Sequence, residues 1–92
     1  MKNIQLNQER RLELSEGPSL EGLAFDHVTG TIFHLNKVGV VVVRRLQSGN
    51  TSLDELIETV AQHFEHPRDL VRADLVDFLR ELRAESLVAW EE

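Results

Sequence analysis

A valine-rich run near the middle of the chain, NKVGVVVVRRLQSG at residues 36–49, limits most strongly what the sequence can fold into. Valine favours strands, but the run is longer than a typical strand. Asn36 is a good N-cap residue for a helix, and Gly49 suits the position just after one. The apolar positions recur at the spacing of one helix face: Val38, Val41, Val42 and Leu46. The run therefore predicts a helix that is held by burial, because valine and glycine are poor helix formers.

Three short segments ahead of this helix alternate between apolar and polar residues, at residues 11–16, 20–26 and 31–35. Alternation with a period of two is typical of strands with one buried face. The apolar residues that share a face within each segment are Leu12 and Leu14, Leu23 and Phe25, and Phe33 and Leu35. Gly30 can adopt the positive φ that a tight turn between the last two segments needs. These segments predict an antiparallel sheet of three strands.

Two further helices follow the valine-rich one. Ser52 and Glu55 form a capping box, which predicts a helix over residues 53–64. Pro67 suits the first turn of another helix, which ends near Ala84. The LVAW segment after it is expected to be a short extended tail. Three strands followed by three helices predict an α+β fold of the winged-helix-like kind.

The size and charge of the chain narrow its class. Its 92 residues predict one domain, residues 1–92. With 16 acidic and 10 basic residues the net charge is −6, which argues against nucleic acid because phosphate binding needs a basic surface. The absence of cysteine excludes disulfides and thiolate chemistry. No apolar run is long enough for a signal peptide or a membrane span, so we expect a cytoplasmic protein with no membrane partner.

Few residues have a spacing that suits catalysis or metal binding. His63 and His66 lie three apart, but zinc sites usually need three or four imidazole or thiolate ligands. Asp74 and Asp77 could form an acid pair, although acidic residues on a solvated helix face are common. The sequence contains no motif for a nucleophile elbow, a phosphate loop or a catalytic triad. We therefore expect no metal, no cofactor and no enzymatic activity.

The last predicted helix carries a basic strip beside the seam that faces the core. At about 100° per residue the seam is Val71, Leu75, Phe78 and Leu82, and the arginine strip is Arg68, Arg72, Val76, Leu79 and Arg83. One interpretation is that the arginine stems cover the edge of the core while their charged ends stay in water. The other is that the strip is a groove wall for an apolar, acidic peptide, because arginine binds carboxylates well. The residues alone leave both interpretations open.

A three-stranded sheet also has two edges, and an open edge offers unpaired N–H and C=O groups to an extended peptide. The candidate edge is the third predicted strand, with Thr31, Ile32, Phe33 and His34. If this edge lies beside the arginine strip, one peptide contacts both. The sequence does not show which strand is the edge.

The ordered series of residues from Leu23 to Val88 resembles the PqqD family, whose members are also called RiPP recognition elements. The shared features are Asp26, Thr29, Gly30, Leu35, Asn36, Gly39, Leu46, Gly49, Thr51, Leu56, Ile57, Val71, Asp74, Leu75, Phe78, Leu79, Leu82, Leu87 and Val88. Each motif is short, so the resemblance depends on their order along most of the chain.

This resemblance implies a function. Domains of the family bind the leader of ribosomally made peptides and present it to modifying enzymes. The resemblance also implies three strands followed by three helices, with the leader added as a strand beside the third strand and against the third helix. On this chain those positions are residues 31–35 and the arginine strip.

Two pathways fit the resemblance. The HVTG segment stands where chaperones of pyrroloquinoline quinone biosynthesis usually carry a PEG-like segment. The pattern D-x-x-T-G-x(4)-L-N-x-x-G is more similar to the standalone leader-binding proteins of lasso-peptide pathways, which deliver the precursor to a separate leader peptidase and whose leaders carry a Tyr-x-x-Pro-type motif. We therefore expect two partners, a precursor leader peptide and a leader peptidase or other modifying enzyme. The quinone pathway is the first alternative, and a winged-helix DNA-binding regulator, which the net charge disfavours, is the second.

Overall fold

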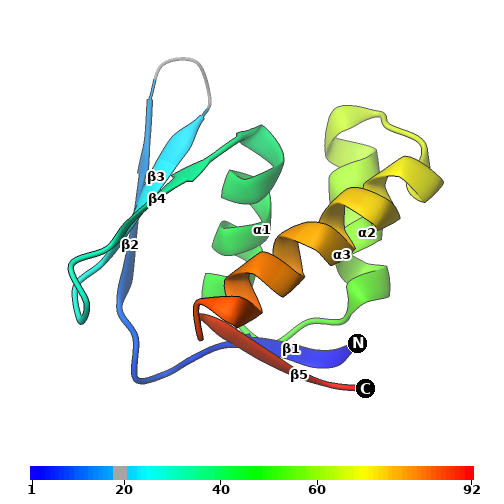
Figure 1. The fold of residues 1–92 in the computed structure, drawn as a ribbon. Helices are drawn as coiled ribbons and strands as arrows, with labels where there is room; N and C mark the ends of the chain where they lie inside the picture. The colour runs from blue at the N-terminus through cyan, green and yellow to red at the C-terminus, as the bar shows by residue number, and fades with distance from the viewer. Residues whose placement is uncertain (18–20) are drawn as a thin grey trace.

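A computed structural model describes residues 1–17 and 21–92 of the protein (Figure 1). Its elements follow in the order β1 (Lys2–Leu6), β2 (Leu12–Glu16), β3 (Gly22–Asp26), β4 (Ile32–Leu35), α1 (Lys37–Gln47), α2 (Leu53–Phe64), α3 (Arg68–Ala84) and β5 (Val88–Glu91). The α+β class is confirmed. The prediction of three strands ahead of the helices is wrong, because in the described residues four strands precede the helices and a fifth follows them. The likeness to a winged helix stays a prediction.

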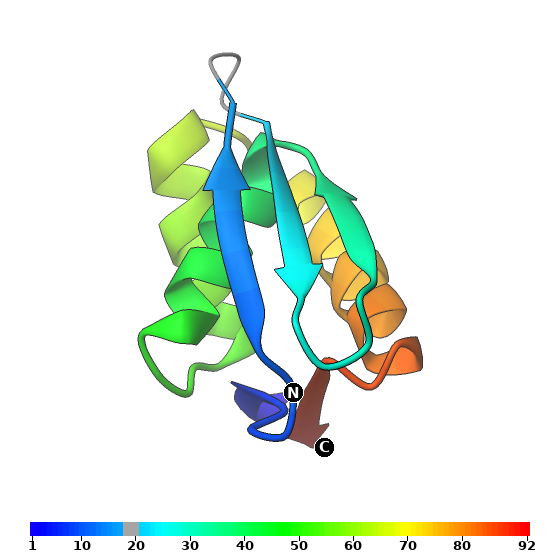
Figure 2. The same cartoon turned by 90° about the vertical axis from the view of Figure 1, so that its left-hand side faces the viewer.

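The strands form two antiparallel sheets (Figures 1 and 2). β2, β3 and β4 make one sheet in that order, and β1 pairs with β5 in a two-stranded ribbon. The strand predicted at residues 20–26 begins at Gly22, and Leu20 lies outside the described residues. Local alternation does not reveal β1 and β5 as partners, because they come from opposite ends of the chain.

The larger sheet turns one face toward the helices and the other toward solvent. The cross-strand pairs place six side chains on the inner face: Leu12, Leu14, Ala24, Asp26, Phe33 and Leu35. Leu23 and Phe25 therefore lie on the outer face, where Leu23 is 39% exposed. The alternation in β3 gives the right period but the wrong buried face, because β3 buries Ala24 and Asp26 instead.

α1 is the helix predicted from the valine-rich run, and it is buried on two sides. The Asn36 side-chain oxygen accepts a hydrogen bond from the Gly39 N–H at 2.8 Å, and Gly49 follows the helix with a φ of 140°. One side of α1 packs against the sheet and the other against α2 and α3. Val40 and Val43 lie on the side that faces the sheet. Val42 and Leu46 lie on the side that faces α2 and α3. Burial on both sides explains a helix made of residues with low helix propensity.

α2 and α3 form the outer helical layer. The Ser52 side chain accepts a hydrogen bond from the Glu55 N–H at 3.2 Å, which confirms the predicted cap of α2. α3 begins directly after Pro67. Phe78, predicted in the core seam, is only half-buried, and Leu79 of the arginine strip is fully buried instead. No helix in the described part of the chain has the length and apolar character needed to cross a membrane.

The ribbon of β1 and β5 closes one end of the core and brings the two termini side by side (Figure 1). Ile4 in β1 is fully buried. Its N–H donates to the Thr51 carbonyl at 2.7 Å, and its carbonyl accepts from the Thr51 N–H at 3.0 Å. β1 therefore joins the last strand to the connection between α1 and α2.

Asp26 is a buried carboxylate that organises the turn between β3 and β4. Three groups donate hydrogen bonds to it: the Arg10 guanidinium at 2.5 Å, the Val28 N–H at 2.9 Å and the Thr29 hydroxyl at 3.0 Å. Burial raises the pKa of the Asp26 carboxyl, but these hydrogen bonds and the charge of Arg10 outweigh burial and lower the pKa from 3.8 to about 2. The carboxylate form is therefore the one that the fold stabilises.

The first prediction concerns this carboxylate. Because its folded pKa is lowered, its contribution to stability is present above pH 3.8 and is lost as the pH falls toward 2. Asp26→Asn should lower the melting temperature at neutral pH by roughly 10 °C, because Arg10 loses its buried partner. Circular-dichroism melts of both proteins at a series of pH values check this. The difference between them should shrink as the pH approaches 2, and a difference that is constant with pH contradicts the assignment.

Candidate functional site

The free edge of β4 is the first part of the candidate site. In an antiparallel sheet both polar backbone groups of one residue point to the same side, and successive residues alternate. The Asp26 N–H donates to the Thr31 carbonyl at 2.9 Å, so Thr31 and Phe33 direct their groups toward β3. Ile32 and His34 therefore direct their N–H and C=O groups away from the sheet.

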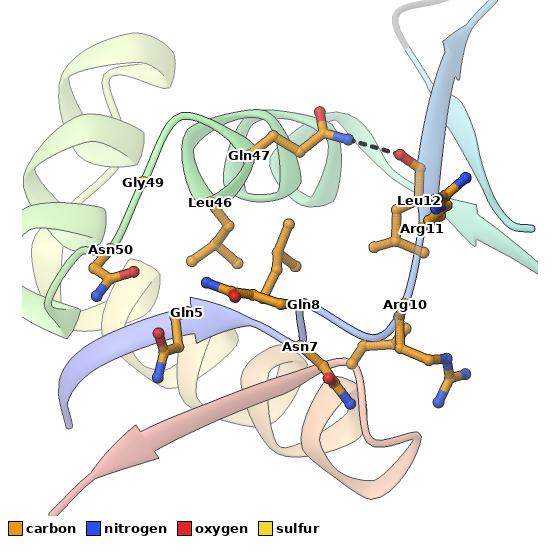
Figure 3. Close-up of a pocket in the computed structure, with 12 residues that line it drawn as sticks. Gln5, Asn7, Gln8, Arg10, Arg11, Leu12, Leu46, Gln47, Gly49 and Asn50 are labelled. Carbon is orange, nitrogen blue, oxygen red and sulfur yellow. Dashed lines mark hydrogen bonds between the residues drawn. The ribbon is translucent and has the colours of Figure 1, made fainter. Parts of the chain in front are cut away.

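β2 forms the other edge of this sheet, and polar side chains of α1 cover it. The Gln47 side chain donates a hydrogen bond to the Leu12 carbonyl at 3.0 Å (Figure 3), and Arg44 pairs with Glu16. Within residues 1–17 and 21–92, no hydrogen bond from another element reaches the outward backbone groups of β4. The structure thus resolves which edge is open: it is that of β4.

A hollow of about 460 Å³ lies beside this edge, between β4 and α3. Figure 2 shows α3 behind the free side of β4. The hollow is lined by Ile32, Phe33, His34 and Leu35 of β4 and by Phe78, Glu81, Leu82, Ala84 and Glu85 from α3 and its end. We call it the β4 groove. Aromatic and aliphatic side chains of both elements line it, and two glutamates from α3 and its end lie among them.

A close contact between α1 and α3 limits the groove at its inner end. A Cβ atom added to Gly39 would lie 3.3 Å from the Phe78 ring and 3.4 Å from the Asn36 side-chain oxygen. The distance to the ring is tighter than most Cβ contacts, so the glycine allows the ring to lie against α1. Phe78 is thereby held at the border between the core and the groove.

A second hollow, of about 300 Å³, continues the β4 groove along α3. It shares Phe78 and Glu81 with the first and adds Asn36, Val38, Gly39, Asp74 and Asp77. Four acidic residues of the α3 region therefore lie along the two hollows: Asp74, Asp77, Glu81 and Glu85. We call them the acidic flank. In the part of the chain that the structure describes, none of the four belongs to an ion pair.

The arginine strip lies on the opposite flank of α3 and lines neither hollow. Arg68 contacts both carboxylate oxygens of Glu58 in α2, at 2.6 and 2.5 Å. Arg72 lies 3.9 Å from the Asp54 carboxylate, also in α2. These two arginines therefore face α2 rather than β4.

The rest of the strip is directed to β5 or to the core. The Arg83 guanidinium lies 4.6 Å from the centre of the Trp90 ring and 3.6 Å from the Glu92 carboxylate. Leu79 is fully buried and Val76 is half-buried. The strip therefore lies outside the β4 groove, and a helical projection cannot show this because it does not tell which flank of α3 meets the sheet. A binding role for the strip stays a prediction.

Among residues 1–17 and 21–92, the structure does not bring potential metal ligands together. His63 and His66 are exposed, and their ring centres lie 4.6 and 6.0 Å, respectively, from that of Phe64. In the described ranges no group of three or more histidine, aspartate or glutamate side chains is placed to hold a metal ion. The β4 groove offers open backbone groups, an apolar surface and negative charges, which together suit binding of an extended chain.

A further hollow, of about 490 Å³, lies at the C-terminal end of α1 (Figure 3). Polar side chains of β1 and of the segment after it line it, among them Gln5, Asn7 and Gln8. β1 is paired on both sides, by β5 and by the Thr51 bridge. Arg10 at its border pairs with Asp26, and the Gln47 side chain donates to the Leu12 carbonyl, so part of its polar lining already has partners within the protein.

Comparison with known proteins identifies the family. The profile of the family described as "Coenzyme PQQ synthesis protein D (PqqD)" matches residues 21–88. The chain belongs to the PqqD family. The match begins just ahead of β3 and ends at the start of β5, so it includes β4, α3 and every residue of the β4 groove.

A solved structure is similar over nearly the whole length of this PqqD-family chain. It is described as "TbiB1 in Complex with the TbiA(beta) Leader Peptide". The TM-score is 0.75 and the sequence identity is 24%, and the match covers 96% of this chain and 98% of the other. The likeness shows a shared fold over nearly the whole chain. Among curated proteins, none matches the chain significantly.

The second prediction concerns the arginine strip of this PqqD-family chain. Arg68→Glu sets a carboxylate against Glu58 and should lower the free energy of unfolding by about 1 kcal/mol, because an exposed attractive pair becomes repulsive. Adding Glu58→Arg should restore the stability. Urea denaturation measures both changes. Equal stability of all three proteins would show that this ion pair does not hold α3 against α2.

Proposed function

We propose that the protein binds the leader peptide of a ribosomally synthesised precursor by adding it as a strand to β4. The observation that carries the proposal is the open edge of β4 beside the apolar β4 groove. Strand addition uses the outward backbone groups of Ile32 and His34 for affinity and the groove for side chains. Membership of the PqqD family supports this function, as does the similar fold of TbiB1, which was solved in complex with a leader peptide.

The contacts proposed for the peptide come from two elements. Ile32 and His34 of β4 supply the open backbone groups, and Thr31 and Phe33 complete the segment 31–34 that the sequence analysis named. Phe33, Phe78 and Leu82 supply the apolar contacts for alternate side chains of the added strand. Contacts between the peptide and the arginine strip, which lies outside the groove, stay a prediction.

We place the protein in lasso-peptide biosynthesis, where it delivers the bound leader to a separate leader peptidase or other modifying enzyme. The HVTG segment in the turn after β3 supports this pathway. The pattern D-x-x-T-G-x(4)-L-N-x-x-G also supports it, because this pattern is similar to that of standalone leader-binding proteins. A chaperone of pyrroloquinoline quinone biosynthesis is the second candidate, because the family's description names that pathway. The neighbouring genes decide: a short precursor beside a peptidase and a cyclase supports the lasso assignment, and quinone-biosynthesis genes overturn it.

The third prediction tests strand addition. His34→Pro or Ile32→Pro removes a backbone donor at the open edge and should weaken binding at least about tenfold, while β3 keeps its own hydrogen bonds to β4. The probe is the leader part of the precursor encoded beside this gene, and the measurement is calorimetric titration.

Two controls accompany the proline variants. His34→Ala and Ile32→Ala remove the same side chains but keep the backbone donor, so they separate the edge from side-chain contacts. Circular dichroism checks that each variant is folded. If both proline variants fold and bind the leader as the wild type does, strand addition to β4 is wrong.

The fourth prediction concerns catalysis, because we propose a binding protein rather than an enzyme. The purified protein should leave the precursor peptide at its original mass, with or without added divalent metal ions. Mass spectrometry after prolonged incubation checks this. Cleavage or a mass change that follows the protein through purification, and that the Ile32→Pro variant loses, would show that the groove supports a reaction.

A further inference from the structure

The charges of α3 are divided between its two flanks. The arginine strip has acidic partners within the protein: Arg68 with Glu58, Arg72 with Asp54 and Arg83 with Glu92. The acidic flank has no such partners among the described residues. Four carboxylates without an ion pair in the described ranges therefore lie along the two hollows beside β4 and α1, whereas Asp69 and Arg80 of α3 line neither hollow.

We propose that the peptide in the β4 groove carries a lysine or arginine among the side chains that it turns toward α3, next to an apolar side chain. This inference rests on the proposed function and specifies the chemistry of the ligand. It reverses the sequence-based expectation of an acidic peptide, which depended on the arginine strip being the groove wall.

The two hollows adjoin along α3, sharing Phe78 and Glu81, and this supports the proposed order of side chains. In an added strand, alternate residues face the same side and lie roughly 7 Å apart. The first hollow is largely apolar, with Phe33, Phe78 and Leu82 in its lining. The second shares the Phe78 border and adds Asp74 and Asp77. An apolar side chain in the first hollow therefore places the side chain two residues away beside the acidic flank.

A basic side chain suits the second hollow in both of its parts. The aliphatic stem of lysine or arginine can pack on Val38 and Phe78, while the charged end reaches the carboxylates of Asp77 and Glu81. An acidic side chain in the same place would meet only negative charge from α3. Charge complementarity of this kind contributes to specificity and to the rate of association.

The experiment uses a display library of random peptides of roughly ten residues, selected on the wild-type protein and on the Asp77→Lys/Glu81→Lys variant. Glu9→Lys is the matched control, because Glu9 is exposed and lines neither hollow. Wild type and control should enrich peptides with lysine or arginine two positions from an apolar residue. The double variant should enrich acidic residues at that position.

Synthetic versions of the selected peptides give the affinities. Replacing the basic residue of a wild-type-selected peptide by glutamate should weaken binding to the wild type at least about fivefold and strengthen binding to the double variant. The wild-type affinity for the basic peptide should also fall as salt rises from about 50 to about 500 mM, because the interaction is screened.

Two results overturn the inference in distinguishable ways. If the selected peptides lose binding to His34→Pro but show no preference for a basic residue, strand addition holds and the charge rule is wrong. If every selected peptide binds His34→Pro as well as it binds the wild type, the proposed function is wrong, and so is the inferred preference for a basic side chain.

Discussion

The burial of α1 on both sides is the constraint on which the rest of the structure depends. Its valines pack against the sheet on one side and against α2 and α3 on the other, so this one helix sets the distance between the two layers. β4 leads into α1 through the Asn36 cap, and the Phe78 ring rests on Gly39. The separation of β4 from α3, and hence the width of the groove, follows from these contacts.

The elements that the sequence predicts correctly are those with strong local signals. Asn36 and Ser52 act as the caps expected of them, and they fix the starts of α1 and α2. β1 has no comparable signal, because its partners are β5 and Thr51, far away in the chain. The buried face of β3 is hidden for a different reason. From the sequence alone, an aspartate is expected to face solvent. The burial of Asp26 is explained by the three groups that donate hydrogen bonds to its carboxylate.

The candidate site could be predicted in part. Period-two alternation identifies β4, and a helical projection of α3 identifies one basic and one acidic flank. Neither pattern says which flank faces which neighbour, since that depends on how α3 crosses α1 and α2. Two arginines turned out to satisfy acids of α2, which a projection of α3 alone does not include. The sequence places Phe78 in the core seam because an apolar side chain at this position fits both a core seam and a groove wall.

The pairing of β1 with β5 has a consequence for how such a domain can be used. The two ends of the chain leave from neighbouring strands of one ribbon, and neither end crosses the exposed side of β4 (Figures 1 and 2). A second polypeptide can therefore be attached at either end, or the whole unit can be inserted into a surface loop of a larger protein through two adjacent junctions. In each arrangement β4 stays accessible. Attachment at the termini and access to the open edge of β4 are thus independent of each other in this fold.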